Sequence, residues 1–237
     1  MKHNSLHDLK TKLQLRWHLY KNRQLQNRDV TIVSNNCIAG VIYHDCGLRF
    51  LSPTVNLWFH TEDFFTYAAN ILEYSPQQGA ELREIFEYGI NYPLGLLTPK
   101  SSDLPAIKLY FQHYPSFEMA KGKWEQRSKR INLENICMIF ECSHPIAENS
   151  SIPELFRAAP YSHKVIVTSK HSVTGKGTEV VSLPVYDLPE YQPGKLFATK
   201  RKLSLSRWLD DFNYVAFLNR TKGKFLTSDS RFYQEYS

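Results

Sequence analysis

The feature that most constrains this chain is a strand that stops in a polar turn and continues at once as a helix. A β-branched run from Val30 to Val33 ends in the turn S-N-N-C, and small and apolar residues with helical spacing follow from Ile38 to His44. In open α/β sheets such a turn lies at the carboxyl edge of the strands, where ligands bind. The free N–H groups of the new helix point toward that edge. The stretch therefore predicts an α/β protein with a ligand site here.

Cys37, the last residue of this turn, is the candidate nucleophile. The dipole at the start of a helix favours a thiolate and can lower the thiol pKa below its free value of about 8.5. Two histidines are candidate bases. His113 follows a strand pattern and would meet the turn if the two strands were parallel neighbours, whereas His60 ends an extended segment. In the alternative interpretation, Cys37 is a small buried packing residue.

Polar side chains around the same turn are candidates for substrate binding. Their hydroxyl and amide groups suit sugar hydroxyls, and the helix N–H groups with Asn35 or Asn36 would stabilise an oxyanion. Alternatively, these side chains only cap the helix, complete local turns or are satisfied internally. The predicted substrate-binding residues of this group are Ser34, Asn35, Asn36, Ser52 and Asn56.

A second group of substrate-binding candidates lies on a helix predicted from Ser116 to about Asn132. Lys123, Arg127 and Arg130 are spaced i, i+4 and i+7 and form a basic ridge. Like charges on one face repel one another unless an anion is near, and Arg offers a bidentate fork to phosphate. The ridge therefore predicts a phosphate, pyrophosphate or carboxylate ligand. A solvated basic face is the alternative.

The rest of the chain indicates how these segments are organised. Residues 135–169 have the pattern of a β-α-β unit, whose strands are expected to be parallel. The predicted fold class is α/β, with a mainly parallel open sheet flanked by helices and an N-terminal amphipathic helix. We expect a basic amphipathic helix at 1–28, a single α/β domain at 29–219 and a C-terminal tail at 220–237. A last helix is predicted from Leu203 to Leu218.

The predicted N-terminal helix carries an apolar stripe with a spacing of three and four residues. The stripe consists of Leu9, Leu13, Trp17 and Tyr20. One interpretation is that this face packs on the protein's own domain or on a second subunit. The other is docking on a membrane surface, because interfacial helices combine a basic face with Trp and Leu. We favour the packed helix.

Composition and charge narrow the classes of partner. The net charge of +6 and pI near 9.0 permit an anionic ligand, but we find no nucleic-acid module or Gly-rich phosphate loop and expect no nucleic-acid partner. The four cysteines lack metal-site spacing, so no metal is expected.

No apolar run reaches the about 18 to 20 residues that span a bilayer, and the charged N-terminus is not a signal peptide. We expect a soluble bacterial cytoplasmic protein, with peripheral association at the inner face of the membrane as a further expectation.

Several stretches resemble a bacterial family of exopolysaccharide-biosynthesis proteins of unknown function. The resemblance starts with S-N-N-C-I-A-G-V-I-Y-H-D-C-G-L and F-L-S-P-T-V-N-L. It continues through Tyr92 to Gly95, Phe111 to Tyr114, Lys123 to Asn132 and Phe212 to Asn219. Such a resemblance implies a role in making surface polysaccharide, without a known reaction.

These observations predict a cytoplasmic transferase in the biosynthesis of bacterial exo-, capsular or lipopolysaccharide. The leading hypothesis is an acyltransferase in which Cys37 is the nucleophile and a sugar or lipid-linked glycan is the acceptor. The donor would be of the acyl-CoA type, and the basic ridge would hold a phosphate-bearing ligand. One alternative is a metal-independent glycosyl- or phosphosugar transferase that uses a nucleotide sugar. Another is a non-catalytic protein that binds or assembles glycans.

Overall fold

The structure of this protein is a computed structural model that describes residues 2–101, 103–202 and 204–220, with side chains from residue 8 onward. The helices are α1 (Lys2–Lys21), α2 (Ile38–Asp45), α3 (Thr61–Ala69), α4 (Phe117–Ser128), α5 (Ile152–Ala158) and α6 (Tyr214–Leu218). The strands are β1 (Thr31–Ser34), β2 (Glu81–Ile85), β3 (Leu94–Thr98), β4 (Ile107–Tyr110), β5 (Ile136–Cys142), β6 (Lys164–Thr168) and β7 (Val180–Ser182). Short 3₁₀ helices lie at Asn22–Gln24, Pro76–Gln78, Pro184–Asp187, Lys195–Phe197 and Trp208–Asp211.

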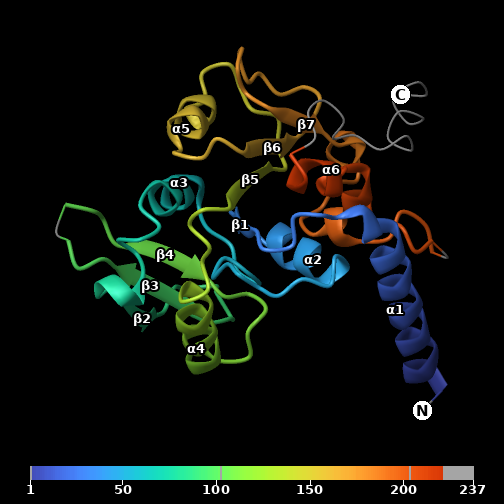
Figure 1. Cartoon of the computed structure of the whole chain (residues 1–237), viewed down its shortest axis with the longest axis horizontal. Coiled ribbons are helices and arrows are strands. Elements are labelled where there is room, and N and C mark those ends of the chain that lie inside the picture. The colour runs from blue at the N-terminus through green and yellow to red at the C-terminus, as the bar shows by residue number, and fades with distance from the viewer. Residues whose placement is uncertain (1, 102, 203, 221–237) are drawn as a thin grey trace.

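A four-stranded parallel sheet in the order β1-β5-β6-β7 forms the centre of the molecule (Figure 1). Val33 pairs with Met138, and Phe140 pairs with Ile166. The central strands carry apolar residues on both faces, as parallel sheets covered on both sides require. The predicted α/β fold with a mainly parallel sheet and an N-terminal helix is confirmed, as is the parallel pairing within residues 135–169.

Two apolar clusters cover the two faces of this sheet. Successive residues of β1 and β5 alternate between them, so that Ile32 and Ile139 point to one cluster while Val33 and Phe140 point to the other. The first cluster contains α2, α6 and the 3₁₀ segments near the C-terminus, and the second contains α3, α4, α5 and strands β2 to β4. The sheet is therefore the middle layer of three.

Strands β2, β3 and β4 form a separate antiparallel sheet, which the sequence did not predict as a unit. Trp58 joins this sheet to the rest of the molecule, because its backbone N–H and carbonyl both bond to Tyr110, each at 3.0 Å. His113 therefore follows an antiparallel strand of the second sheet. It does not follow a parallel neighbour of β1, as its proposed meeting with Cys37 had assumed.

Helix α1 packs on the molecule by its polar face, which corrects the prediction that the apolar stripe packs on the protein's own domain, while packing of the stripe on a second subunit stays a prediction. Leu9, Leu13 and Tyr20 are 54%, 46% and 66% exposed, whereas His18 is 0% exposed. The N-terminal half of α1 extends beyond the body of the molecule in Figure 1. Within the described residues, no helix combines the length and the apolar composition needed to cross a bilayer.

The predicted last helix is broken into two short pieces. A 3₁₀ turn at Trp208–Asp211 is followed by Phe212 in extended conformation, and α6 then starts after Asn213, whose side chain accepts a hydrogen bond from Ala216 N–H. Competing local caps of this kind interrupt a helical pattern. Of the predicted tail at 220–237, all but the first residue lie outside the described residues.

Candidate functional site

A pocket of about 720 Å³ opens at the carboxyl edge of β1 and β5. This is the edge at which α/β sheets bind ligands, and the volume is in the range typical of small-molecule sites. Its walls come from the turn before α2, the segment before α3, the loop between β2 and β3, the loop after β4, the end of β5, and the segment before and within the 3₁₀ helix at Lys195–Phe197. The lining residues are Asn36, Cys37, Trp58, Tyr92, Gln112, His113, Glu141, Ser143, Tyr191, Pro193, Gly194, Leu196 and Phe197.

Asn36 links the start of α2 to a carboxylate in the pocket. Its Oδ1 accepts a hydrogen bond from Ile38 N–H at 3.0 Å, which satisfies one of the free donors of the helix. Its Nδ2 donates to Oε2 of Glu141 at 2.8 Å. The helix start therefore fixes the amide, and the amide fixes the orientation of the carboxylate.

Asn35 extends the pairing of β1 with β5 by one residue. Its side chain donates to the Glu141 carbonyl at 2.9 Å and accepts from the Glu141 N–H at 2.8 Å. These two bonds take the place of the backbone hydrogen bonds between β1 and β5 at the point where the chain leaves the sheet. Because both amide atoms are used, Asn35 positions Glu141 and does not line the pocket.

Glu141 is the most perturbed carboxyl group of the pocket. Burial raises its pKa to about 7, although the nearby Tyr186 hydroxyl and the Asn36 amide offset part of that shift. A carboxylate with a pKa near the working pH is suited to take a proton from a substrate and give it back. Perturbed groups in a pocket are also the best physical indicators of a functional site.

Cys37 lines the same pocket, but burial opposes the ionisation of its thiol. Burial raises its pKa to about 11, which is the opposite of the lowering expected at the start of a helix. Desolvation causes this shift, because the thiol is mostly enclosed. The role of Cys37 as a nucleophile stays a prediction that this pKa disfavours.

The two candidate bases lie in different places. His113 is exposed and lines the pocket with Cys37 and Gln112. His60 lies outside that lining, where its Nε2 is 2.9 Å from the Tyr110 hydroxyl. Of the two predicted bases, the structure brings only His113 to the pocket.

Aromatic side chains form much of the pocket wall. Trp58 stacks on Tyr110 with ring centroids 3.8 Å apart and an angle of 12° between the rings, which holds its indole in a fixed orientation. Tyr92, Tyr191 and Phe197 line the same cavity and are partly buried. A pocket of aromatic walls with a few fixed polar groups is the usual design of a site for a small organic ligand.

The remaining candidates near the turn do not line the pocket, and the two serines are hydrogen-bonded inside the protein. The Ser34 hydroxyl donates to the Asn36 carbonyl and accepts from Ala39 N–H. Ser52 is fully buried, and its hydroxyl accepts from Thr54 N–H at 3.2 Å. Asn56 adopts a left-handed backbone conformation with φ of 65° and does not line the pocket. For Ser34 and Ser52 the structure favours the alternative of local turn and cap chemistry.

The predicted basic ridge does not form one surface. Arg127 is 6% exposed, and its guanidinium donates to the Tyr114 hydroxyl at 2.6 Å and to the Val55 carbonyl at 3.3 Å. Arg130 donates to a backbone carbonyl at 3.4 Å, while Lys123 is exposed. Arg127 therefore stabilises the loop that precedes α3, and no three-residue anion site remains on this helix.

Sequence reasoning missed Glu141 and the residues from the last third of the chain. Glu141 belongs to the apolar strand sequence I-C-M-I-F-E-C. A single acidic residue near the carboxyl end of such a strand can indicate a functional site at that edge of the sheet. Tyr191 and Phe197 follow in a segment that resembles an edge loop. No local pattern places that segment over the pocket.

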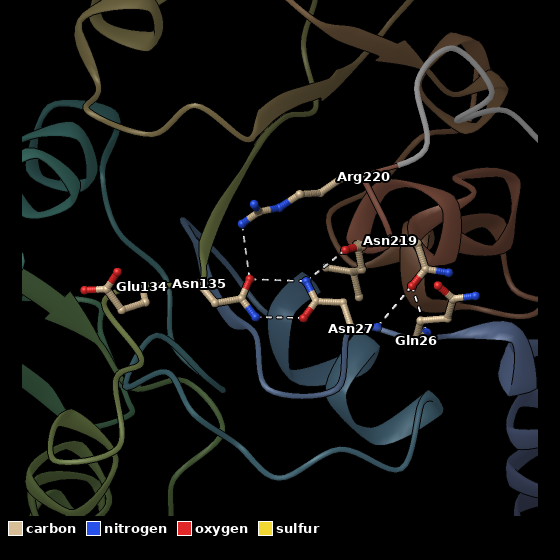
Figure 2. A pocket seen from close by; sticks show the side chains of 7 residues that line it. Gln26, Asn27, Glu134, Asn135, Asn219 and Arg220 are labelled. Carbon is tan, nitrogen blue, oxygen red and sulfur yellow. Dashed lines mark hydrogen bonds between the residues drawn. The ribbon is translucent and has the colours of Figure 1, made fainter.

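A second cavity, of about 460 Å³, lies near the opposite edge of the sheet. Figure 2 shows amide side chains around it, together with Glu134 and with Arg220, whose guanidinium donates to Asn135. Asn27 and Asn135 exchange two hydrogen bonds of 3.2 and 2.7 Å, and Asn219 Oδ1 accepts from the N–H groups of Gln26 and Asn27. These amides already have partners, so the cluster ties the starts of β1 and β5 to the end of α6.

The fold and this pocket define the chain as a three-layer α/β protein with a site at the carboxyl edge of its parallel sheet. The chain belongs to the family described as "Domain of unknown function (DUF1919)", whose model matches residues 9–219. It is also similar to an uncharacterized protein of Haemophilus influenzae (strain ATCC 51907 / DSM 11121 / KW20 / Rd). The two are 32% identical over 171 residues, which cover 70% of this chain and 77% of that protein.

Proposed function

We propose that this protein is a cytoplasmic transferase that modifies a sugar hydroxyl during the synthesis of bacterial surface polysaccharide. The observation that carries the proposal is Glu141, a carboxyl group with a pKa of about 7 in a pocket with aromatic walls. Proton transfer from a hydroxyl needs a base of this kind. The choice of polysaccharide rests on the sequence resemblance, and the pocket supports an organic acceptor with hydroxyl groups.

In the proposed reaction Glu141 acts as general base in a single displacement. Its carboxylate takes the proton of the acceptor hydroxyl, and the oxygen forms a bond to the electrophilic carbon of the donor. The bond from that carbon to the leaving group breaks, and the leaving group departs with the electron pair. His113 lies in the same pocket and would supply a proton to it. The donor is a nucleotide sugar or an acyl thioester, because both carry such a carbon.

The covalent acyltransferase route through Cys37 is the competing mechanism. It requires a thiolate, and a pKa of about 11 leaves little of it near neutral pH. Direct attack by the acceptor oxygen needs no thiolate. The two mechanisms therefore differ in which residue is indispensable.

The test is complementation of a strain that lacks the gene, with the composition of its surface glycan measured by mass spectrometry. Glu141→Gln keeps the size of the side chain and removes the base, so we expect loss of the modification, by about 100-fold or more in rate. Cys37→Ala should retain it. Circular dichroism of both purified variants checks that they fold. Loss with Cys37→Ala and retention with Glu141→Gln would reverse the assignment.

A glycan-binding role without chemistry is the second candidate, and the aromatic wall that includes Trp58 favours it. Saturation-transfer NMR with simple pyranosides separates the two roles. A binding protein would give transfer to the sugar protons in wild type and in Glu141→Gln alike, and the strain carrying Glu141→Gln would keep its normal glycan.

A further inference from the structure

Helix α1 is attached to the molecule by a buried polar network. The ring of His18 donates from Nδ1 to the Gln14 carbonyl at 2.8 Å, and its Nε2 lies 3.2 Å from Oδ1 of Asp210 and 3.4 Å from Oδ2 of Asp45. Lys21 pairs with Asp210, and Arg207 pairs with Asp45. All three central side chains are at most 3% exposed. This network determines which face of α1 is turned inward.

The face opposite His18 carries exposed apolar side chains. With about 100° per residue, Leu9, Leu13 and Tyr20 lie within about 40° of one another and far around the helix from His18. Leu9 is 54% exposed, Leu13 46% and Tyr20 66%. Large apolar side chains on one helix face are normally buried, so this exposed stripe is available to something outside the described part of the chain.

Basic side chains border the stripe. Lys12 and Arg16 lie next to it on the helix surface, Arg23 follows the end of α1 with its guanidinium over the Tyr20 ring, and all three are exposed. Residues 2–28 contain seven Lys and Arg and a single acidic residue, Asp8. Pairing this face with the same face of a second copy would bring cations against cations, which is unfavourable. This face of α1 is complementary to a surface that carries negative charge and has an apolar interior beneath it.

We propose that the exposed face of α1 docks this protein on an anionic lipid bilayer. Leu9, Leu13 and Tyr20 would enter the boundary between headgroups and acyl chains, while Lys12, Arg16 and Arg23 would lie among the anionic headgroups. The polar network of His18 holds the helix with this face outward. The proposal does not depend on the chemistry of the pocket.

Sedimentation of the full chain with vesicles tests the proposal. Vesicles of phosphatidylcholine and phosphatidylglycerol, in a ratio of about 7 to 3, should bind the wild type, and vesicles of phosphatidylcholine alone should not. Raising the salt concentration to about 0.5 M should weaken the binding, because exposed charges are then screened. Failure of the wild type to bind the anionic vesicles would overturn the proposal.

Matched variants locate the contact. Leu13→Gln and Arg16→Glu should each reduce vesicle affinity, the second by about five- to thirtyfold, since each charge near an anionic surface contributes on the order of one RT or more. Leu133→Gln changes a side chain of similar exposure (50%) on another part of the surface, and Lys129→Glu makes the same charge change directly after α4. Both controls should bind like the wild type. Equal binding by all four variants would place the contact elsewhere.

Light scattering tests whether a second copy of the chain, instead of a bilayer, covers the exposed face of α1. The proposal expects that the wild type and Leu13→Gln have the same mass in solution without lipid. If the wild type is a dimer that Leu13→Gln converts to monomer, the stripe is a subunit interface and the proposal is wrong.

Discussion

At the residue scale, the burial of Glu141 has a consequence for stability that is separate from catalysis. In an unfolded chain its pKa is near the ordinary value of 4.5, whereas in the folded protein it is about 7. The folded protein holds this proton more tightly, so the free energy of unfolding decreases as pH rises from about 4.5 to about 7 and is then level. We predict that Glu141→Gln removes this slope and is more stable than the wild type by about 1 to 3 kcal/mol at pH 8. Urea denaturation at pH 5 and pH 8 measures both effects, and a variant with the wild-type slope would show that the carboxyl is not perturbed.

Arg127, which was predicted to bind substrate, stabilises the fold, whereas the buried Glu141 destabilises it above neutral pH. Its charge is buried against the Tyr114 hydroxyl and the Val55 carbonyl. Arg127→Met keeps much of the side-chain volume but leaves these groups with fewer partners, and we predict a loss of about 2 kcal/mol of stability. Arg130→Met, which removes one long hydrogen bond at 3.4 Å, is the matched control and should cost less than half of that. Thermal unfolding followed by circular dichroism compares the two variants, and equal losses would contradict the structural role.

At the scale of elements, the attachment of α1 depends on His18. Removal of this ring leaves Asp45 and Asp210 buried with fewer donors, although Lys21 and Arg207 remain. We predict that His18→Ala lowers stability by about 3 kcal/mol and increases hydrogen exchange along α1. Leu13→Ala, on the exposed face, should change neither quantity by much. Exchange in α1 that is the same in His18→Ala and wild type would show that the helix is held by other contacts.

The same element shows which part of the structure could be predicted from sequence. The β1 turn and α2 were predictable because a β-branched run, a capping asparagine and Gly47 at the helix end are all local signals. The packed face of α1 was not, because Asp210 lies 192 residues from His18 in the sequence. An apolar stripe predicts which face of a helix is buried only when no buried charged residue elsewhere in the chain pairs with the opposite, polar face.

At the scale of the whole molecule, the candidate site is assembled from segments that are far apart in the sequence. Cys37 and Asn36 were predictable because they belong to the turn at the end of β1. His113 reaches the pocket from the antiparallel sheet, and Phe197 reaches it from the segment after β7. Local periodicity carries no information on how a second sheet packs against the first. The turn residues and His113 were therefore predicted from the sequence, whereas Glu141 and the aromatic wall were not.

The central sheet is shared by both apolar clusters, and this arrangement predicts how the molecule unfolds. Ile139 and Phe140 are neighbours on β5, both at most 1% exposed, and they point into opposite clusters. Ile139→Ala and Phe140→Ala should each cost about 2 to 5 kcal/mol, because each leaves a cavity in one cluster. Since loss of either layer exposes the same sheet, we predict that both variants shift a single cooperative transition. Urea unfolding followed in parallel by far-UV circular dichroism and tryptophan fluorescence should give coincident curves for both. If Phe140→Ala separates the two curves while Ile139→Ala does not, the second cluster with its antiparallel sheet unfolds on its own, and the chain then contains two folding units.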